Sequence, residues 1–247
     1  GPGQGVAFNP AGTVIGVSGY NSPILSLYPF NVSTGYGTKY ANPTPSSGTA
    51  GTDITFNPAG TVVAVAAWDS PRVLAWPWTG SSFGTKYADP ATLPNSVGFS
   101  INFSPDGASL AVGSNGTPWI QVYPWSSGFG TKYANPATLP GAAVRQPVFN
   151  PTSDVLAMAA ATGSFGVAAY PWSGAGFGTK YANPATNPPI GYGASFNADG
   201  TVLAIADAST SPYVFAYPFS VGGGFGTKYA NPATLPSGAA YGLAFSK

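Results

Sequence analysis

The sequence predicts an all-β fold, a five-bladed β-propeller of four-stranded antiparallel blades with a redundant C-terminal innermost strand. The first observation is the phrase Gly37-Thr38-Lys39-Tyr40-Ala41-Asn42-Pro43, which recurs around Lys86, Lys132, Lys180 and Lys228 at spacings of 46 to 48 residues. A second phrase, Phe8-Asn9-Pro10-Ala11-Gly12, returns in variant form at Phe56, Phe103, Phe149 and Phe196, and in part at Phe245. The third observation is the lack of any useful helical periodicity. Together they indicate one blade-sized unit copied five times.

The third repeat shows the elements of one blade in order. Residues 100–103 and 109–113 are short apolar runs on either side of Pro105-Asp106-Gly107, which favours a tight turn, so they are expected to form strands a and b. Residues 119–125 are rich in aromatic and β-branched side chains and predict strand c. Residues 129–134 predict strand d, which Asn135-Pro136 ends because proline has no N–H to donate.

The repeats cover residues 4–50, 51–97, 98–143, 144–190 and 191–237, and we expect a single domain over 4–247 because such units bury their faces against one another. Residues 1–3 resemble the scar of a cleaved purification tag. Residues 238–247 begin a sixth strand a with no b, c or d. We expect residues 240–245 to compete with residues 4–8 for the innermost strand of the first blade and to act as a clasp. A free tail and pairing with another molecule are the alternatives.

The composition excludes several classes of function. Cys, His and Glu are absent, and the charged residues are six Lys, two Arg and seven Asp, with a net charge of +1. Zinc, thiol and imidazole chemistry are therefore excluded, and the basic excess typical of nucleic-acid binding is missing. No apolar stretch is long enough for a membrane helix. The sequence predicts a soluble, non-enzymatic protein without cofactor or metal, monomeric unless residues 238–247 exchange between chains.

Two resemblances add to this prediction. Phe103-Ser104-Pro105-Asp106-Gly107 followed by Leu110-Ala111-Val112-Gly113 resembles the opening of a WD40 repeat. The Gly-His pair of that family is missing, and its Trp-Asp pair is replaced by aromatic-Pro-aromatic triplets such as Tyr123-Pro124-Trp125, so its internal His/Asp network is not implied here. The wording Phe-Gly-Thr-Lys-Tyr-Ala-Asn-Pro is also similar to repeat proteins of tailed phages and marine viruses, which implies a virion-associated or extracellular location.

The features found in every repeat are interpreted as structural. The five repeated lysines lie on the predicted outermost strand, where Lys commonly guards an exposed sheet edge. The aromatic-Pro-aromatic triplets occupy the same blade position each time, which favours packing between blades over sugar stacking. The Asn-Pro and Asp-Pro steps are expected to form turns.

Function is expected where the repeats differ, in the b–c and d–a loops that emerge on one face of a propeller. Their aromatic, amide, arginine and aspartate side chains have the composition of a recognition surface. The alternative is that unpacked loops simply vary. The candidate binding residues are Tyr20, Asp53, Trp68, Asp69, Arg72, Asn95, Asn115, Trp119, Arg145, Phe165, Tyr192, Asp207 and Tyr241.

Catalysis is disfavoured. Asp53, Asp69 and Asp207 come from different blades without defined partners, so a glycosidase-like pair is unsupported, and no loop has calcium-ligand spacing. The sequence therefore predicts a macromolecular binding or structural module, whose partner is a protein or a glycan of unknown identity. The alternative is a five-bladed lectin that holds glycans in pockets between blades. A lectin should offer similar pockets in most blades, and a protein binder one asymmetric patch.

Overall fold

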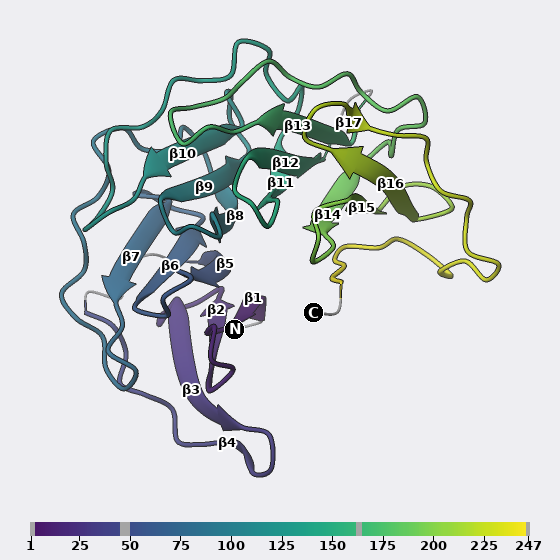
Figure 1. The fold of residues 1–247 in the computed structure, drawn as a ribbon. Helices are drawn as coiled ribbons and strands as arrows, with labels where there is room; N and C mark the ends of the chain where they lie inside the picture. Colours follow the sequence, from purple (N-terminus) through teal and green to yellow (C-terminus); the bar gives the residue numbers. More distant parts are fainter. Residues whose placement is uncertain (1–2, 45–49, 162–164, 246–247) are drawn as a thin grey trace. The chain divides into compact units, whose positions relative to one another are not determined.

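The computed structural model describes residues 3–44, 50–161 and 165–245. Within these residues the chain forms β-strands and no helix, and the strands make five antiparallel sheets (Figure 1). Each sheet comes from one sequence repeat, which confirms the predicted all-β, five-bladed class. The chain divides into two compact units, residues 1–116 with 122–132 and residues 117–121 with 133–247. The single-domain assignment stays a prediction, as does the tag scar, of which positions 1 and 2 lie outside the described residues.

The strands follow the repeats in order along the chain. The first repeat contributes β1 (Gly3–Phe8), β2 (Val14–Gly19), β3 (Leu25–Asn31) and β4 (Gly35–Tyr36). The second contributes β5 (Gly51–Phe56), β6 (Val62–Ala67) and β7 (Val73–Pro77), and the third β8 (Gly98–Phe103), β9 (Ser109–Ser114) and β10 (Ile120–Pro124). The fourth contributes β11 (Val144–Phe149), β12 (Val155–Ala160) and β13 (Val167–Pro171), and the fifth β14 (Gly191–Phe196), β15 (Val202–Asp207), β16 (Val214–Ser220) and β17 (Gly224–Phe225). Each sheet follows chain order.

The turn between strands a and b is closed by the asparagine side chain of the Phe-Asn-Pro-Ala-Gly phrase. In the second repeat the Oδ1 atom of Asn57 accepts hydrogen bonds from the N–H groups of Thr61 and Val62, both at 2.8 Å. Gly60 has a φ of 69°, a left-handed conformation that glycine adopts without steric cost. The asparagine thus fixes the hairpin, and the glycine allows it to close.

The predicted strand d is the main error of the sequence analysis. It is reduced to the two-residue strands β4 and β17, and in the middle repeats to the single bridges Trp78↔Phe83, Trp125↔Phe129 and Trp172↔Phe177. The segment still donates to strand c, as from the Gly84 N–H to the Pro77 carbonyl (2.9 Å) and from the Tyr87 N–H to the Ala75 carbonyl (3.0 Å). Pro77 has no N–H to donate in return. Between these two hydrogen bonds the segment advances three residues, from Gly84 to Tyr87, while strand c advances only two, from Pro77 to Ala75. A regular ladder therefore cannot form.

The tyrosine of the repeated Gly-Thr-Lys-Tyr phrase packs on the third strand of the following repeat. In the first unit, Tyr40 meets Trp78 and Tyr87 meets Trp125, edge to face, with ring centroids 4.9 and 5.1 Å apart. In the second unit, Tyr133 meets Trp172 at 5.0 Å and Tyr181 meets Phe219 at 5.5 Å. This contact is the repeated junction between consecutive blades within each unit.

The repeated lysines are held locally by the same phrase. The Nζ atom of Lys39 donates to the Oδ1 atom of Asn42 three residues later, and Lys180 and Lys228 donate in the same way to Asn183 and Asn231. In the second repeat the acceptor is Asp89, which forms an ion pair with Lys86. These contacts support the structural interpretation of the lysines.

The aromatic-Pro-aromatic triplets form the core, as predicted. The first aromatic ring of the triplet is fully buried in the second to fifth repeats, at Trp76, Tyr123, Tyr170 and Tyr217. The hydroxyls of Tyr123, Tyr170 and Tyr217 donate to the carbonyls of Thr92, Thr138 and Thr186 in the preceding repeat, at 2.8, 2.8 and 2.6 Å. The buried phenols thus supply a second contact between consecutive repeats.

The C-terminal segment does not form the predicted sixth strand. Residues 231–245 carry no strand, because no b strand of their own follows to pair with them. The segment nevertheless lies beside β14, where a Cβ added to Gly193 would lie 3.0 Å from the Cα of Gly242. The Ala240 N–H also donates to the Asp207 carbonyl at 3.0 Å. It therefore occupies the place of a next strand a against the fifth repeat.

Candidate recognition surface

Every strand a contains a β-bulge at the same place. The pairing with strand b shifts between residues 3 and 5, 51 and 53, 98 and 100, 144 and 146, and 191 and 193. The extra residues are Gln4, Thr52, Phe99, Arg145 and Tyr192. A bulge interrupts the alternation of a strand and re-aims one side chain, and bulges are enriched next to functional sites. The re-aimed residue differs in every repeat, whereas the residue before it is glycine in four of the five.

In the second unit, two of these bulge residues come together with an aromatic of the C-terminal segment. The guanidinium carbon of Arg145 lies 5.0 Å from the ring centroid of Tyr192, within cation–π range. Tyr192 meets Tyr241 edge to face at 5.1 Å and 88°. Tyr241 is 65% exposed, whereas the other two side chains are half-buried. These three predicted residues form a ladder, which we call the Arg-Tyr ladder.

In the first unit, the loop between β6 and β7 carries three predicted residues. The Trp68 side chain is exposed, and the backbone N–H of Trp68 donates to the Ala50 carbonyl at 2.9 Å. Arg72 has a φ of 64° and its Nη1 atom donates to the Pro94 carbonyl at 3.3 Å. The Arg72 N–H donates to the Asp69 carbonyl at 2.7 Å, and the Oδ2 atom of Asp69 is buried without a hydrogen-bond partner. The loop therefore presents an indole beside a fixed arginine.

Asp53 lies between two strands rather than on an open surface. Its carboxylate accepts hydrogen bonds from the Ser100 hydroxyl at 2.6 Å, the Ile101 N–H at 3.0 Å and the Ile54 N–H at 2.8 Å. Burial raises the pKa of Asp53 above its ordinary value, and these three hydrogen bonds act in the opposite direction. The carboxylate ties β5 to β8. Gln146 has the same role between β11 and β14, where its Oε1 atom accepts from the Ala194 N–H at 2.9 Å.

Asp207 is fully buried and closes the loop that follows β15. Its Oδ1 atom accepts from the N–H groups of Ser209 and Thr210 at 2.8 and 2.9 Å, and its Oδ2 atom accepts from the Ile190 N–H at 2.8 Å. Both carboxylate oxygens are thus engaged in holding two loops together.

Of the remaining predicted residues, Asn95 lies beside the loop of Asn115, because a Cβ added to Gly116 would lie 3.5 Å from the Cβ of Asn95. Tyr20 and Phe165 are exposed, Asn95 and Asn115 are exposed on loops of the first unit, and Trp119 is half-buried. The loop of Phe165 begins with Thr162-Gly163-Ser164, which lie outside the described residues.

Sequence reasoning missed a shared feature of the b–c loops. Cis peptide bonds precede Pro23, Pro71, Pro118 and Pro212, and the residue after the last three has a positive φ. These residues are Arg72, Trp119 and Tyr213. Tyr213 therefore occupies the position in its repeat that two predicted binding residues, Arg72 and Trp119, occupy in theirs. The signal was a Ser-Pro or Thr-Pro pair at the same place in four repeats.

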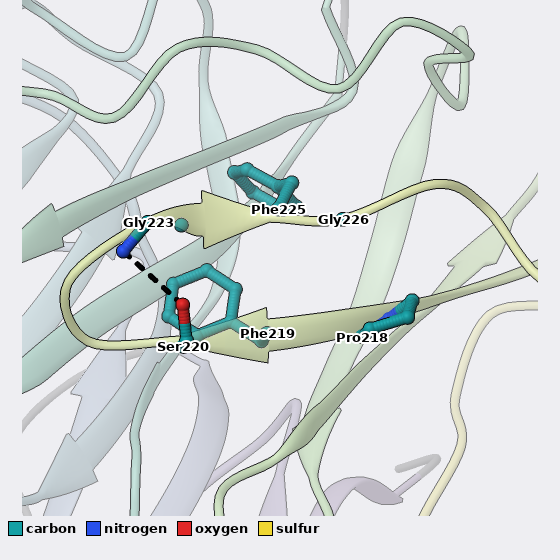
Figure 2. Close-up of a pocket in the computed structure, with 7 residues that line it drawn as sticks. Pro218, Phe219, Ser220, Gly223, Phe225 and Gly226 are labelled. Carbon is teal, nitrogen blue, oxygen red and sulfur yellow. Dashed lines mark hydrogen bonds between the residues drawn. The ribbon is translucent and has the colours of Figure 1, made fainter.

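Two hollows lie beside hairpins that follow the third strand of a repeat. Figure 2 shows one along the β16–β17 hairpin, where Phe219 and Phe225 lie on the paired strands and the Gly223 N–H donates to the Ser220 hydroxyl at 3.1 Å; its volume is about 290 Å³. The other, of about 450 Å³ in the first unit, is lined by Ala41, Asn42, Thr44, Ser82, Phe83, Gly84 and Thr85. Neither hollow includes a predicted binding residue.

The described residues offer neither a metal-binding cluster nor a membrane-spanning helix. Residues 3–44, 50–161 and 165–245 contain no group of three His, Cys, Asp or Glu side chains that could hold a metal ion. The same residues contain no helix with the length and apolar character needed to cross a membrane.

Comparison with known proteins gives a likeness in fold. No protein-family model and no curated protein sequence matches the chain. Among solved structures, hydrazine synthase of Kuenenia stuttgartiensis, which contains a β-propeller, is similar with a TM-score of 0.65 and 14% sequence identity. The match covers 87% of this chain and 64% of that chain, so this chain spans less than two thirds of the protein it resembles. At this identity the likeness shows that the chain has a propeller-like all-β fold.

Proposed function

We propose that the chain is a non-catalytic binding module that engages another macromolecule, most simply a protein, through the bulge residues and the b–c and d–a loops. The observation that carries the proposal is the bulge in every strand a. It presents a different side chain in each repeat, namely Gln4, Thr52, Phe99, Arg145 and Tyr192, on an otherwise repeated backbone. Different side chains at equivalent positions favour an asymmetric recognition surface in each unit over five equal pockets.

The side chains on each unit's surface support recognition rather than chemistry. The Arg-Tyr ladder and the exposed Trp68 are of the residue types that most often anchor protein interfaces. The carboxylates of Asp53 and Asp207 are occupied by structural hydrogen bonds, so they offer no acid–base pair. A phage or virus-associated context remains part of the proposal and rests on the sequence resemblance alone.

A lectin-like function is the second candidate, because one hollow fits a sugar. The hollow of about 450 Å³ in the first unit lies between Ala41, Asn42 and Thr44 of the first repeat and residues 82–85 of the second. Its lining combines the hydroxyls of Thr44, Ser82 and Thr85 with an aromatic ring, Phe83, which is the usual make-up of a sugar site. The hollow along β16–β17 has a different lining, so the two do not form a repeated set.

The two candidates are separated by three variants, Tyr241→Ala, Tyr36→Ala and Phe83→Ala, and by two assays. Tyr241→Ala removes a ring that is 65% exposed at the loop face, and Tyr36→Ala removes one that is 66% exposed on β4, outside the loops. Proteins captured from lysates of the source cells are quantified by mass spectrometry for the variants and the wild type, and the same chains are applied to a glycan array.

A protein binder should lose a defined captured protein in Tyr241→Ala and keep it in Tyr36→Ala. Loss of an anchoring ring costs about 2 kcal/mol, roughly a thirtyfold loss of affinity. Equal capture by both variants contradicts the loop-face proposal. Strong glycan binding that disappears in Phe83→Ala favours the lectin instead.

A further inference from the structure

Three repeats place a large side chain in a backbone conformation that favours glycine. The residue after the b–c loop proline is Arg72 in the second repeat, Trp119 in the third and Tyr213 in the fifth, with φ angles of 64°, 67° and 63°. In this left-handed region the Cβ atom of a bulky residue crowds its own backbone, which lowers the stability of the fold. Residues held in such conformations cluster at functional sites.

The backbone of these loops needs the conformation but not the side chain. The Arg72 N–H donates to the Asp69 carbonyl at 2.7 Å, and the Tyr213 N–H donates to the Thr210 carbonyl at 3.0 Å. The carbonyls of Arg72 and Tyr213 each accept a further hydrogen bond at 2.9 Å. Glycine could form both hydrogen bonds without the steric cost. The shape of the loop therefore does not explain the arginine or the tyrosine.

The fold gains little from these side chains. In the part of the chain that the structure describes, neither the indole of Trp119 nor the phenol of Tyr213 makes a hydrogen bond or a ring contact. Arg72 donates from Nη1 to the Pro94 carbonyl at a long 3.3 Å, and its Nε atom is buried without a hydrogen-bond partner. Where the same position serves the core, as at Ile24, the residue is apolar, fully buried and has an ordinary φ.

The three side chains share one chemistry that fits a polypeptide. Each is a flat group with an N–H or O–H donor at its edge, and guanidinium and indole groups accept no hydrogen bond. A polypeptide segment offers main-chain carbonyls as acceptors, and Arg, Trp and Tyr are the residue types that most often anchor protein interfaces. Sugar hydroxyls also need acceptors, but the Asp207 carboxylate in the loop of Tyr213 has both oxygens engaged.

We propose that Arg72, Trp119 and Tyr213 determine which partner the loops accept, and that the partner is an extended polypeptide segment whose carbonyl oxygens bind these donors. This role rests on the proposed loop-face function, to which it adds Tyr213. The bulky residue is kept in a strained position because its side chain contacts the partner. Arg72 belongs to the first unit and the other two to the second, and each acts within its own unit.

The first test needs no partner and measures thermal unfolding. Tyr213→Ala and Tyr213→Gly both remove the ring, but only glycine relieves the left-handed conformation. The glycine variant should therefore have the higher Tm of the two and stay within about 3 °C of the wild type, and the same order is expected at Arg72. A glycine variant less stable than the alanine variant overturns the proposal, because the side chain or its Cβ then serves the fold.

The second test uses a phage-displayed library of random linear peptides as the probe. Peptides selected on the wild-type chain are measured against Tyr213→Gly and Arg72→Gly. Ser153→Gly is the matched control, since Ser153 has a φ of 60° but lies in an a–b turn, where the other four repeats have glycine. The selected peptides should bind this control like the wild type and lose about tenfold or more in affinity for one of the two loop variants.

Three outcomes overturn the proposal. They are equal affinity of the selected peptides for all variants, a library that yields no binding peptide, and glycan-array binding that is lost in the two loop variants, which would make a sugar the occupant. The proposed function fails separately. Partner capture that is lost in Tyr241→Ala but kept in Tyr213→Gly and Arg72→Gly overturns only the role of the strained residues, whereas equal capture by Tyr241→Ala and Tyr36→Ala contradicts the loop face itself.

Discussion

Gly98 is expected to be a position where one methyl group disturbs the loop face. A Cβ added at Gly98 would lie 2.6 Å from the carbonyl oxygen of Arg72, and ordinary van der Waals contact begins at 3.4 Å. Gly98 has an ordinary φ, so the effect of Gly98→Ala comes from this contact and not from backbone strain. The Arg72 peptide or the start of β8 must therefore move.

The Arg72 peptide has little freedom to move. Its carbonyl accepts from the Ala67 N–H at 2.9 Å, its N–H donates to the Asp69 carbonyl at 2.7 Å, and its side chain donates to the Pro94 carbonyl. Overpacking costs about 1–3 kcal/mol, and loss of one buried hydrogen bond costs about 1–3 kcal/mol. We expect Gly98→Ala to lower the free energy of unfolding by about 2–4 kcal/mol, which lowers Tm by roughly 5–15 °C in a chain of this size.

The assay is thermal and urea unfolding followed by circular dichroism. Gly242→Ala is the matched control, because a Cβ there meets nothing within 4 Å and its φ is also ordinary. Gly51→Ala should behave like Gly98→Ala, since its Cβ would lie 2.5 Å from the Ile24 carbonyl. A change in Tm below about 2 °C for Gly98→Ala, or one equal to that of Gly242→Ala, would refute the reasoning.

Three further predictions concern buried and exposed polar groups. Gln121 is 2% exposed, and neither the oxygen nor the nitrogen of its side-chain amide has a hydrogen-bond partner. Gln121→Met should therefore raise the free energy of unfolding, measured in urea, by about 1–2 kcal/mol. A loss of stability would contradict this. Burial raises the pKa of the Tyr123, Tyr170 and Tyr217 phenols above the ordinary value of 10.0, so the stability they contribute is complete below about pH 10 and is lost as the pH rises further. Tyr170→Phe should therefore make the free energy of unfolding fall less steeply with pH, measured from pH 8 to 12. An unchanged slope would exclude Tyr170 as a source of this pH dependence. Lys86 and Asp89 form a partly exposed ion pair, so Lys86→Gln should change the free energy of unfolding by less than about 1 kcal/mol, and a larger loss would show that the phrase depends on its charge.

Much of the fold could be predicted from the sequence because the repeats state it several times. The Phe-Asn-Pro-Ala-Gly phrase locates strands a and b, since its asparagine and glycine act within a few residues of each other. Strand d failed because Pro77 and its equivalents sit in the neighbouring strand, where their lack of an N–H weakens the pairing of a segment that otherwise looks like a strand. The error came from judging one segment without its partner.

The candidate site was less predictable, for a reason of distance along the chain. Asp53 was predicted as a binding residue at the start of a strand, but its partners Ser100 and Ile101 come from the next repeat, 47 and 48 residues away. The bulge that aims Arg145 and Tyr192 is a property of the pairing between two strands, which residue types alone do not reveal. The Arg-Tyr ladder was nevertheless composed of predicted residues, because variation between repeats pointed to them.

The tyrosine junction also has a direction, since each repeat gives a ring and receives one. If one whole repeat were removed, such as residues 98–143, Tyr87 would have Trp172 as its partner in the next repeat instead of Trp125. The junction would again join a tyrosine to a tryptophan. No junction carries information about how many repeats precede or follow it. Duplication or loss of a whole repeat would therefore keep the tyrosine junctions intact, and only contacts specific to one pair of repeats, such as that of Asp53 with Ser100, would have to change.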